Sequence, residues 1–104
     1  MDFFEIESNT KTRLEDEQQL QEPCMKRVLL HNDDYTTMEF VINILEKIFH
    51  KSPAEATVIM LNVHHNGIGI CGVYPADIAE TKVSEVHREA RQAGFPLKAS
   101  TEPV

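Results

Sequence analysis

The sequence lacks any apolar run of about 18 residues, the length that a membrane-spanning helix requires, and therefore predicts no transmembrane segment. Its first residues are acidic and contain no long apolar segment, so we also expect no secretory signal peptide. Its two cysteines, Cys24 and Cys71, lie far apart and outside any CxxC pattern. The sequence thus predicts neither a disulfide framework nor a cysteine metal site, which suits a reducing cytoplasm.

Clusters of basic residues are missing as well. The 104 residues carry a formal net charge of -7, whereas phosphate binding needs grouped lysines and arginines. We therefore expect no nucleic-acid partner. A chain of this length has room for one small core and hence for one folded domain.

The excess of negative charge lies mainly in the first quarter of the chain. Residues 1–24 contain seven acidic residues against Lys11 and Arg13, a net charge of -5, and residues 25–104 contain ten acidic and eight basic residues, a net charge of -2. We predict a disordered acidic N-terminal extension over 1–24 and a folded core domain over 25–104. The aromatic start Asp2-Phe3-Phe4-Glu5-Ile6 is either an ordinary disordered start or a segment that docks on a partner.

The core domain begins with a strand and a helix. Val28-Leu29-Leu30 is a short apolar run that indicates a buried strand. Thr36 and Glu39 have the spacing of a capping box, which predicts a helix start at Thr36. The residues that follow form an apolar stripe at a period of 3.6 residues: Phe40, Val41, Ile44, Leu45, Ile48 and Phe49.

Two more helices and two more strands follow. Ser52 and Pro53 predict the start of the second helix and Asn66-Gly67 its end, with Ala56, Ile59, Met60 and Val63 buried. Residues 68–74 indicate a strand whose glycines permit close backbone approach. Residues 75–94 predict a third helix that buries Ile78, Ala79, Val83, Val86 and Ala90, and residues 96–101 a last strand. The fold class is α+β in the order β-α-α-β-α-β, with the helices on one face of a small antiparallel or mixed sheet.

The turn between the first strand and the first helix is a candidate binding site. Asn32, Asp33 and Asp34 present several acceptors from a rigid base, which suits capture of an ammonium group. Met38 adds an adaptable apolar wall one helical turn further on. The alternative is an ordinary Asx-turn followed by a helix cap.

A second group of residues can complete this site. His64 and Met60 lie four residues apart and so share one face of the second helix. If the two helices pack as a hairpin, Met60, Val63 and His64 meet Met38 and Val41. Acceptors beside an apolar slot suit a free α-amino group with a bulky side chain. The alternative is a half-exposed histidine without a role.

Metal binding and catalysis have less support. No two of the five histidines have the i,i+4 spacing of helical metal ligands, and the adjacent His64 and His65 diverge by about 100° around their helix. Asp34 and His64 have no visible nucleophile, and no Gly-x-Ser-x-Gly motif is present. We expect no enzyme activity, no metal and no cofactor.

Several blocks of the sequence resemble the ClpS family, the bacterial adaptors of the ClpA–ClpP protease. The longest block runs from Val28 to Val41 and includes His31-Asn32-Asp33-Asp34-Tyr35-Thr36. The other blocks are Ala56-Thr57, Met60-Leu61, Val63-His64, Gly67, Cys71-Gly72-Val73-Tyr74, Ala79-Glu80-Thr81-Lys82-Val83, Pro96-Leu97 and Glu102. The resemblance covers about residues 25–102, in order and without gaps.

The resemblance implies a fold and a substrate site. The implied fold has helices against a three-stranded sheet. The implied substrates are N-degrons, which are proteins whose first residue is Leu, Phe, Tyr or Trp. Their α-amino group would be held by Asn32, Asp34 and His64, with Asp33 and Thr36 nearby. Their side chain would enter a pocket lined by Met38, Val41, Met60, Val63 and Leu97, where Met38 excludes β-branched residues.

The resemblance also implies delivery of the substrate to a ClpA-type AAA+ unfoldase. The surface that docks on its N-terminal domain would contain Asp77, Glu80, Thr81 and Lys82, and the extension before Pro23 would engage the unfoldase during delivery. We expect a cytoplasmic monomer. Thr37, Phe95 and Ala99 depart from the usual Pro, His and Cys of the family. Two alternatives stay open, a small metal-binding regulator and a peptide-binding domain unconnected to a protease.

Overall fold

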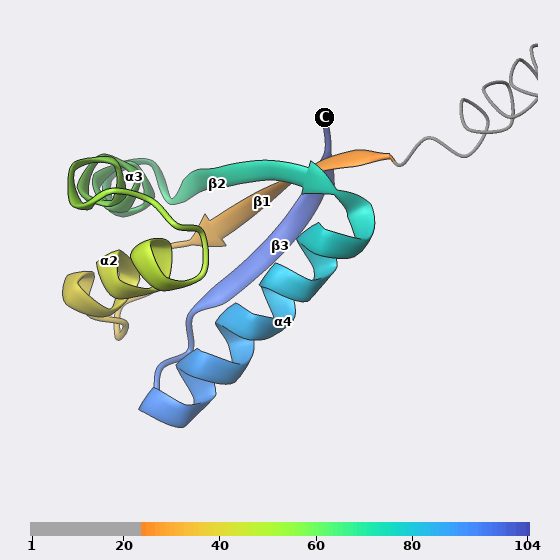
Figure 1. Cartoon of the computed structure of the whole chain (residues 1–104). Coiled ribbons are helices and arrows are strands. Elements are labelled where there is room, and N and C mark those ends of the chain that lie inside the picture. Colours follow the sequence, from red (N-terminus) through yellow and green to blue (C-terminus); the bar gives the residue numbers. More distant parts are fainter. Residues whose placement is uncertain (1–23) are drawn as a thin grey trace, which may run out of the picture.

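The computed structural model describes residues 24–104, so almost all of the predicted disordered extension lies outside the described residues. The described chain forms β1 (Met25–His31), α2 (Met38–Lys47), α3 (Pro53–Asn66), β2 (Ile68–Pro75), α4 (Ala76–Ala93) and β3 (Lys98–Pro103). This order confirms the predicted α+β fold (Figure 1). None of the described helices is long and apolar enough to cross a membrane.

β1 is the central strand of the sheet. The strand order is β2-β1-β3, and β1 pairs antiparallel with both neighbours. Its apolar run Val28-Leu29-Leu30 is buried, as a strand with a neighbour on each side favours. The pairing with β2 shifts at this run, because Val28 lies opposite Gly72 and Leu29 opposite Ile70. The extra residue of this bulge is Cys71, whose burial raises the pKa of its thiol to about 12.

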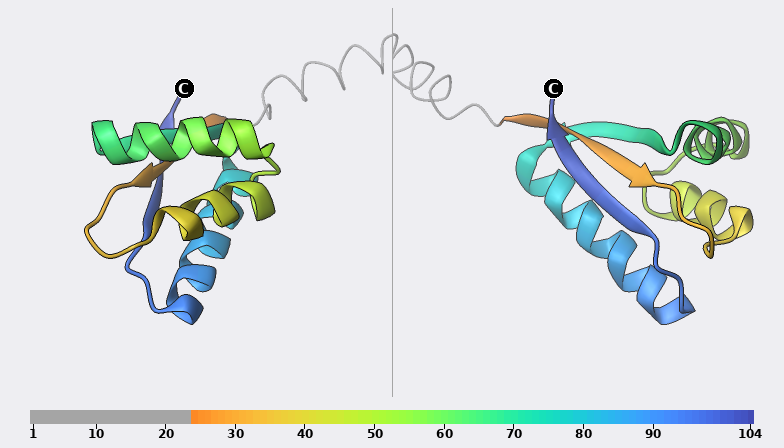
Figure 2. Two further views of the ribbon diagram at one scale, coloured as in Figure 1. Left: turned by 90° about the vertical axis from the view of Figure 1, so that its left-hand side faces the viewer. Right: turned by 180° about the vertical axis from the view of Figure 1, so that it is seen from behind.

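All three helices cover the same face of the sheet. Figure 2 shows α4 running along the strands, while α2 and α3 lie across one end of the sheet. One buried apolar cluster joins these helices to the sheet: Val28, Leu30, Val41, Ile44, Leu45, Ile48, Phe49, Ala56, Met60, Val63, Cys71, Ala79, Val86, Ala90, Leu97 and Ala99. The opposite face of the sheet has no helix from the described part of the chain.

The contact between β2 and α3 requires a glycine. A Cβ atom at Gly69 would lie 2.6 Å from Cγ2 of Val63 and 3.2 Å from the carbonyl oxygen of Ile59. Such distances leave no room for a side chain. The close backbone approach predicted from the glycines of this strand is therefore confirmed at Gly69.

The predicted ends of α3 are confirmed. The Ser52 hydroxyl accepts a hydrogen bond from the backbone NH of Glu55 at 3.2 Å, and the Glu55 carboxylate accepts one from the NH of Ser52 at 3.0 Å. Pro53 occupies the first turn, and Gly67 ends the helix with a φ of 85°. Both ends of α3 therefore lie at the residues that the local sequence signals predict.

The start of α2 differs from the prediction by one residue. The N-cap is Thr37, whose hydroxyl accepts a hydrogen bond from the NH of Phe40 at 3.2 Å. Thr36 instead donates its hydroxyl to Oδ2 of Asp33 at 2.7 Å. The predicted capping box of Thr36 and Glu39 is therefore wrong, because the preceding turn uses the Thr36 side chain first.

Three smaller details also differ. Ile78 was predicted to be buried but is 45 % exposed, because the buried stripe of Ala79, Val86 and Ala90 lies about 100° away around α4. The last strand covers Lys98–Pro103 rather than residues 96–101. Phe49 lies beyond the end of α2 but is still buried.

Candidate functional site

The candidate site begins where β1 ends. Asn32 follows the last residue of β1 and donates its backbone NH to the carbonyl of Gly67 at 2.9 Å. Because Gly67 is the C-cap of α3, this bond holds the turn after β1 against the last turn of α3, where His64 lies. No sequence pattern predicted this hydrogen bond, because Asn32 and Gly67 are 35 residues apart in the sequence.

Asp33 stabilises the turn from within. Its Oδ1 accepts the backbone NH of Tyr35 at 2.8 Å and that of Thr36 at 2.7 Å, and its Oδ2 accepts the Thr36 hydroxyl. Burial by itself raises the pKa of Asp33, but these hydrogen bonds to the ionised carboxylate together hold the pKa below its ordinary value. Asp33 and Thr36 thereby fix the backbone from which Asn32 and Asp34 project.

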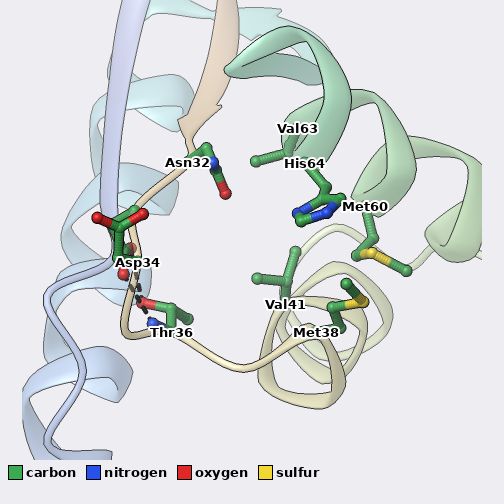
Figure 3. A pocket seen from close by; sticks show the side chains of 9 residues that line it. Asn32, Asp34, Thr36, Met38, Val41, Met60, Val63 and His64 are labelled. Atoms are coloured by element: carbon green, nitrogen blue, oxygen red, sulfur yellow. Dashed lines mark hydrogen bonds between the residues drawn. The ribbon is translucent and has the colours of Figure 1, made fainter.

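A cavity of about 230 Å³ lies between this turn and the two short helices. Figure 3 shows its parts: Met38 and Val41 belong to α2, Met60, Val63 and His64 belong to α3, and Asn32, Asp34 and Thr36 belong to the turn. Asp33 completes the lining. Every lining residue belongs to the set predicted for the substrate site, and α2 and α3 meet as the hairpin prediction required.

The apolar residues that line the cavity differ in exposure. Val41, Met60 and Val63 are almost completely buried, whereas Met38 is 48 % exposed. A methionine has three rotatable bonds and a polarisable thioether, so its side chain adapts to the shape of its neighbours. Met38 therefore forms an adjustable rim on a slot whose other walls are fixed by the core.

The polar part of the cavity consists of side chains without internal partners. Asn32, Asp34 and His64 are exposed, and no side-chain hydrogen bond within residues 24–104 uses them. A carboxylate, an amide oxygen and a neutral imidazole nitrogen are all acceptors. Within the same residues, no three His, Cys, Asp or Glu side chains gather as a metal site would require. This end of the cavity suits a cationic hydrogen-bond donor.

Leu97 is the one predicted pocket residue that does not line this cavity. It is buried in the core cluster that also contains Val41, and it lines a separate hollow with His87 and Phe95. It directly precedes Lys98, which lies opposite His31 at the end of β1, so Leu97 lies beside the strand end from which the Asn32–Asp34 turn begins. Leu97 is thus part of the buried core near this turn, and its contact with the substrate side chain stays a prediction.

The residues predicted to contact an unfoldase lie on the first two turns of α4. Asp77 and Thr81 are exposed, and the Thr81 hydroxyl donates to the carbonyl of Asp77 at 3.0 Å. Glu80 is exposed too, and its carboxylate accepts a hydrogen bond from the Thr101 hydroxyl of β3 at 3.0 Å. These polar groups are therefore accessible from outside while they also stabilise the helix and its contact with β3.

Lys82, the fourth residue of this set, is directed toward the core. Its ammonium group donates to the carbonyl of Ile48 at 2.8 Å and lies 5.8 Å from the ring centre of Phe49 and 5.3 Å from that of Tyr74. Ile48 is the C-cap of α2. Lys82 therefore connects α4 to the end of the helix whose other end borders the cavity.

Comparison with known proteins identifies relatives of this chain. Residues 21–100 match the family model described as ATP-dependent Clp protease adaptor protein ClpS. The chain is 59 % identical over 86 residues to the ATP-dependent Clp protease adapter protein ClpS of Desulfatibacillum aliphaticivorans, covering 83 % of each chain. It is 58 % identical over 96 residues to the protein of the same name from Nitratidesulfovibrio vulgaris strain Miyazaki F, covering 92 % of this chain and 94 % of that one.

A solved structure is similar as well. It is the structure of Agrobacterium tumefaciens ClpS2 bound to L-phenylalaninamide, with a TM-score of 0.77 and 40 % sequence identity. The match covers 80 % of this chain and all of the other. Its ligand combines a free α-amino group with an aromatic side chain.

Proposed function

The chain belongs to the ClpS family of ATP-dependent Clp protease adaptors, and we propose that it recognises N-degrons and delivers them to a ClpA-type unfoldase. The recognised feature is a free α-amino group on a first residue that is Leu, Phe, Tyr or Trp. The chain is an adaptor, and the peptide bonds of the substrate are cleaved by the protease that receives it. We place this activity in the cytoplasm.

One observation carries the proposal: a single cavity joins three acceptors without internal partners to a buried apolar slot. The two halves match the two features of an N-terminal residue with a bulky side chain. The structure of Agrobacterium tumefaciens ClpS2 bound to L-phenylalaninamide, at 40 % identity, supports the same chemistry.

The polar end binds the ammonium group. An α-amino group has a pKa near 7.7–8.0 and is largely protonated at neutral pH, so it needs acceptors around it. Asp34 supplies a charge-assisted hydrogen bond, Asn32 a neutral amide oxygen, and His64 a ring nitrogen in its neutral form. Asp33 and Thr36 would contribute indirectly, because the hydrogen bonds between them position Asn32 and Asp34.

The apolar end selects the side chain. Val41, Met60 and Val63 provide fixed walls, and Met38 closes the exposed side. A side chain that branches at Cβ is widest next to the ammonium group, and we propose that Met38 would contact the bound residue there. Met38 is therefore the residue that favours Leu, Phe, Tyr and Trp over Ile and Val.

Delivery uses another surface. Asp77, Glu80 and Thr81 are exposed on α4 and would contact the N-terminal domain of the unfoldase, and Lys82 would contribute by holding α4 in place. The acidic residues before Pro23 would engage the unfoldase while the substrate is transferred. The adaptor would act as a monomer and bind neither nucleic acid nor membrane.

The first test is fluorescence anisotropy with a labelled peptide that begins with Leu, beside its N-acetylated twin. We expect tight binding of the free amine and a loss of binding after acetylation, since acetylation removes the positive charge and two donors. Equal binding of both peptides would contradict the ammonium role of Asn32, Asp34 and His64. A pull-down with a ClpA-type unfoldase, with and without the substitution Glu80→Ala, tests delivery separately.

A further inference from the structure

The two edges of the sheet are protected to different degrees. α4 lies along the β3 edge, where His87 Nε2 accepts the backbone NH of Ala99 at 3.0 Å and Glu80 accepts the hydroxyl of Thr101. β3 also contains residue types that discourage pairing with a further strand, namely Lys98, Glu102 and Pro103. This edge is closed.

The β2 edge has no comparable protection within the described residues. Its sequence, IGICGVYP, contains no charged residue, and its only strand neighbour is β1. Ile68, Ile70 and Val73 are 40 %, 52 % and 45 % exposed on the face without helices. Leu29 lies opposite Ile70 in the register and joins them into one apolar stripe. An uncharged apolar edge of this kind is ready to pair with another extended segment.

The undescribed part of the chain is attached beside this edge. The carbonyl of Cys24 accepts the backbone NH of Ala76 at 2.8 Å, and Met25 lies opposite Pro75, the last residue of β2. Residues 1–23 therefore join the molecule at the end of the unprotected strand.

That part of the chain contains a segment with the pattern of a strand. Phe4-Glu5-Ile6-Glu7 alternates apolar and acidic residues with a period of two. Residues 7–23 separate Ile6 from Cys24 and can span up to about 56 Å at about 3.3 Å per residue, whereas β2 is about 26 Å long by the same rise. The segment can reach every position on the β2 edge, and covalent linkage raises its local concentration.

We propose that residues 3–7 of this chain add to the free edge of β2 as a fourth strand. Phe4 and Ile6 then extend the apolar stripe formed by Ile68, Ile70 and Val73, and backbone hydrogen bonds satisfy the outer edge of β2. The acidic extension is held on the sheet until a partner competes for it. The contact does not depend on the ligand of the cavity.

The test uses the full chain and three variants. Phe4→Ser/Ile6→Ser removes the two apolar side chains, and Glu5→Pro removes a backbone donor but keeps both of them. Leu14→Ser/Leu20→Ser is the matched control, because it removes two apolar residues elsewhere in the extension. Methyl NMR spectra of Ile68, Ile70 and Val73 and hydrogen exchange of the β2 amides report on the edge. The methyl groups of Ile44 and Val86 report on the core.

We expect both Phe4→Ser/Ile6→Ser and Glu5→Pro to shift the β2 methyl signals and to speed exchange of the outer β2 amides by about tenfold or more. The control variant should match the wild type, and the core methyl signals should stay unchanged in all three. β2 signals that are identical in wild type and Phe4→Ser/Ile6→Ser would overturn the proposal. So would signals that change with protein concentration, together with a dimer in sedimentation that survives these substitutions, since a second copy would then occupy the edge.

Discussion

The polar side chains of the cavity and those at the start of α4 differ in whether they form hydrogen bonds within the protein. Asn32, Asp34 and His64 are exposed, and their side chains form no hydrogen bond to another side chain or backbone group among residues 24–104. On α4, by contrast, Glu80 bonds to β3 and Lys82 bonds to the end of α2. The cavity side chains are thus available to a ligand, whereas Glu80 and Lys82 take part in the fold.

This difference separates recognition from stability. A polar group without an internal partner contributes little to folding and keeps its full hydrogen-bonding capacity for a ligand. A group that already bonds to another element contributes to the fold, and an external partner must compete for it. Substitutions in the cavity should therefore change affinity, and substitutions at Lys82 should change stability.

The largest effect is expected for Asp34→Ala. Loss of a hydrogen bond to a charged group costs about 1.5–3 kcal/mol, which corresponds to an affinity about ten to a hundred times weaker. The free energy of unfolding should not change, because Asp34 is exposed. Anisotropy titration of a Leu-initiated peptide measures the first quantity and urea denaturation the second, with Asp77→Ala as the control. Wild-type affinity in Asp34→Ala would remove Asp34 from the site.

Asp33→Ala should affect both quantities, because Asp33 lies in the cavity but bonds internally. Loss of three hydrogen bonds in the turn should lower the free energy of unfolding by about 1–3 kcal/mol and should weaken peptide binding by displacing Asp34. Asp33→Asn retains one acceptor oxygen and should lose less. Urea denaturation at neutral pH should rank the free energies of unfolding as wild type above Asp33→Asn and Asp33→Asn above Asp33→Ala.

The contribution of Asp33 should also depend on pH. Its pKa in the folded state lies below the unfolded value, so its stabilising effect is present above the unfolded value, near 3.9 for an aspartate, and is lost as the pH falls through the folded value. The stability difference between wild type and Asp33→Asn should therefore narrow below about pH 4. A difference that stays constant across this range would contradict the hydrogen-bonding role.

Met38→Ala should relax the selection of the side chain. Removing the exposed wall of the slot opens space near Cβ of the bound residue. The preference for Leu over Ile should therefore fall by about tenfold, which is the discrimination that a pocket achieves between side chains differing by about one methylene group. Stability should change little, because Met38 is half-exposed. Competition between Leu- and Ile-initiated peptides measures the ratio, and an unchanged ratio would mean that another residue sets it.

The smallest effect is expected for Lys82→Met, which retains the apolar stem but loses the ammonium group. Loss of the bond to Ile48 and of the contacts with Phe49 and Tyr74 should cost about 1 kcal/mol of stability. Lys47→Met is the matched control, because its ion pair with Glu89 is exposed at the lysine end and such pairs contribute about 0–1 kcal/mol. If both variants unfold at the same urea concentration, Lys82 does not connect α4 and α2 as described.

Local sequence patterns predicted the elements and most of the site. The cap at Ser52 with Pro53 in the first turn, the helix end at Gly67 and the close approach at Gly69 all appear as predicted, because each depends on the conformation or size of one or two residues. The residues of the cavity were predicted from a turn rich in acceptors, helical periodicity and a family resemblance. These signals need no knowledge of distant contacts.

Other features depended on which groups compete for the same partner in three dimensions. Thr36 and Thr37 both suit a helix cap, and the turn formed by Asp33 decides between them. Lys82 resembles a surface lysine in the sequence, yet in the structure its ammonium group donates a hydrogen bond to the carbonyl of Ile48 at the end of α2.

The sequence by itself determined the order of the elements, the apolar faces of α2 and α3, and the residue types available to bind an amine. The tertiary structure decided that Leu97 is buried in the core, that Ile78 is exposed, and that the Asp33 side chain holds the turn from which Asp34 projects. The physical reason is that propensity and periodicity act within a few residues, whereas the partner of a polar side chain is chosen by elements that meet only after the chain has folded.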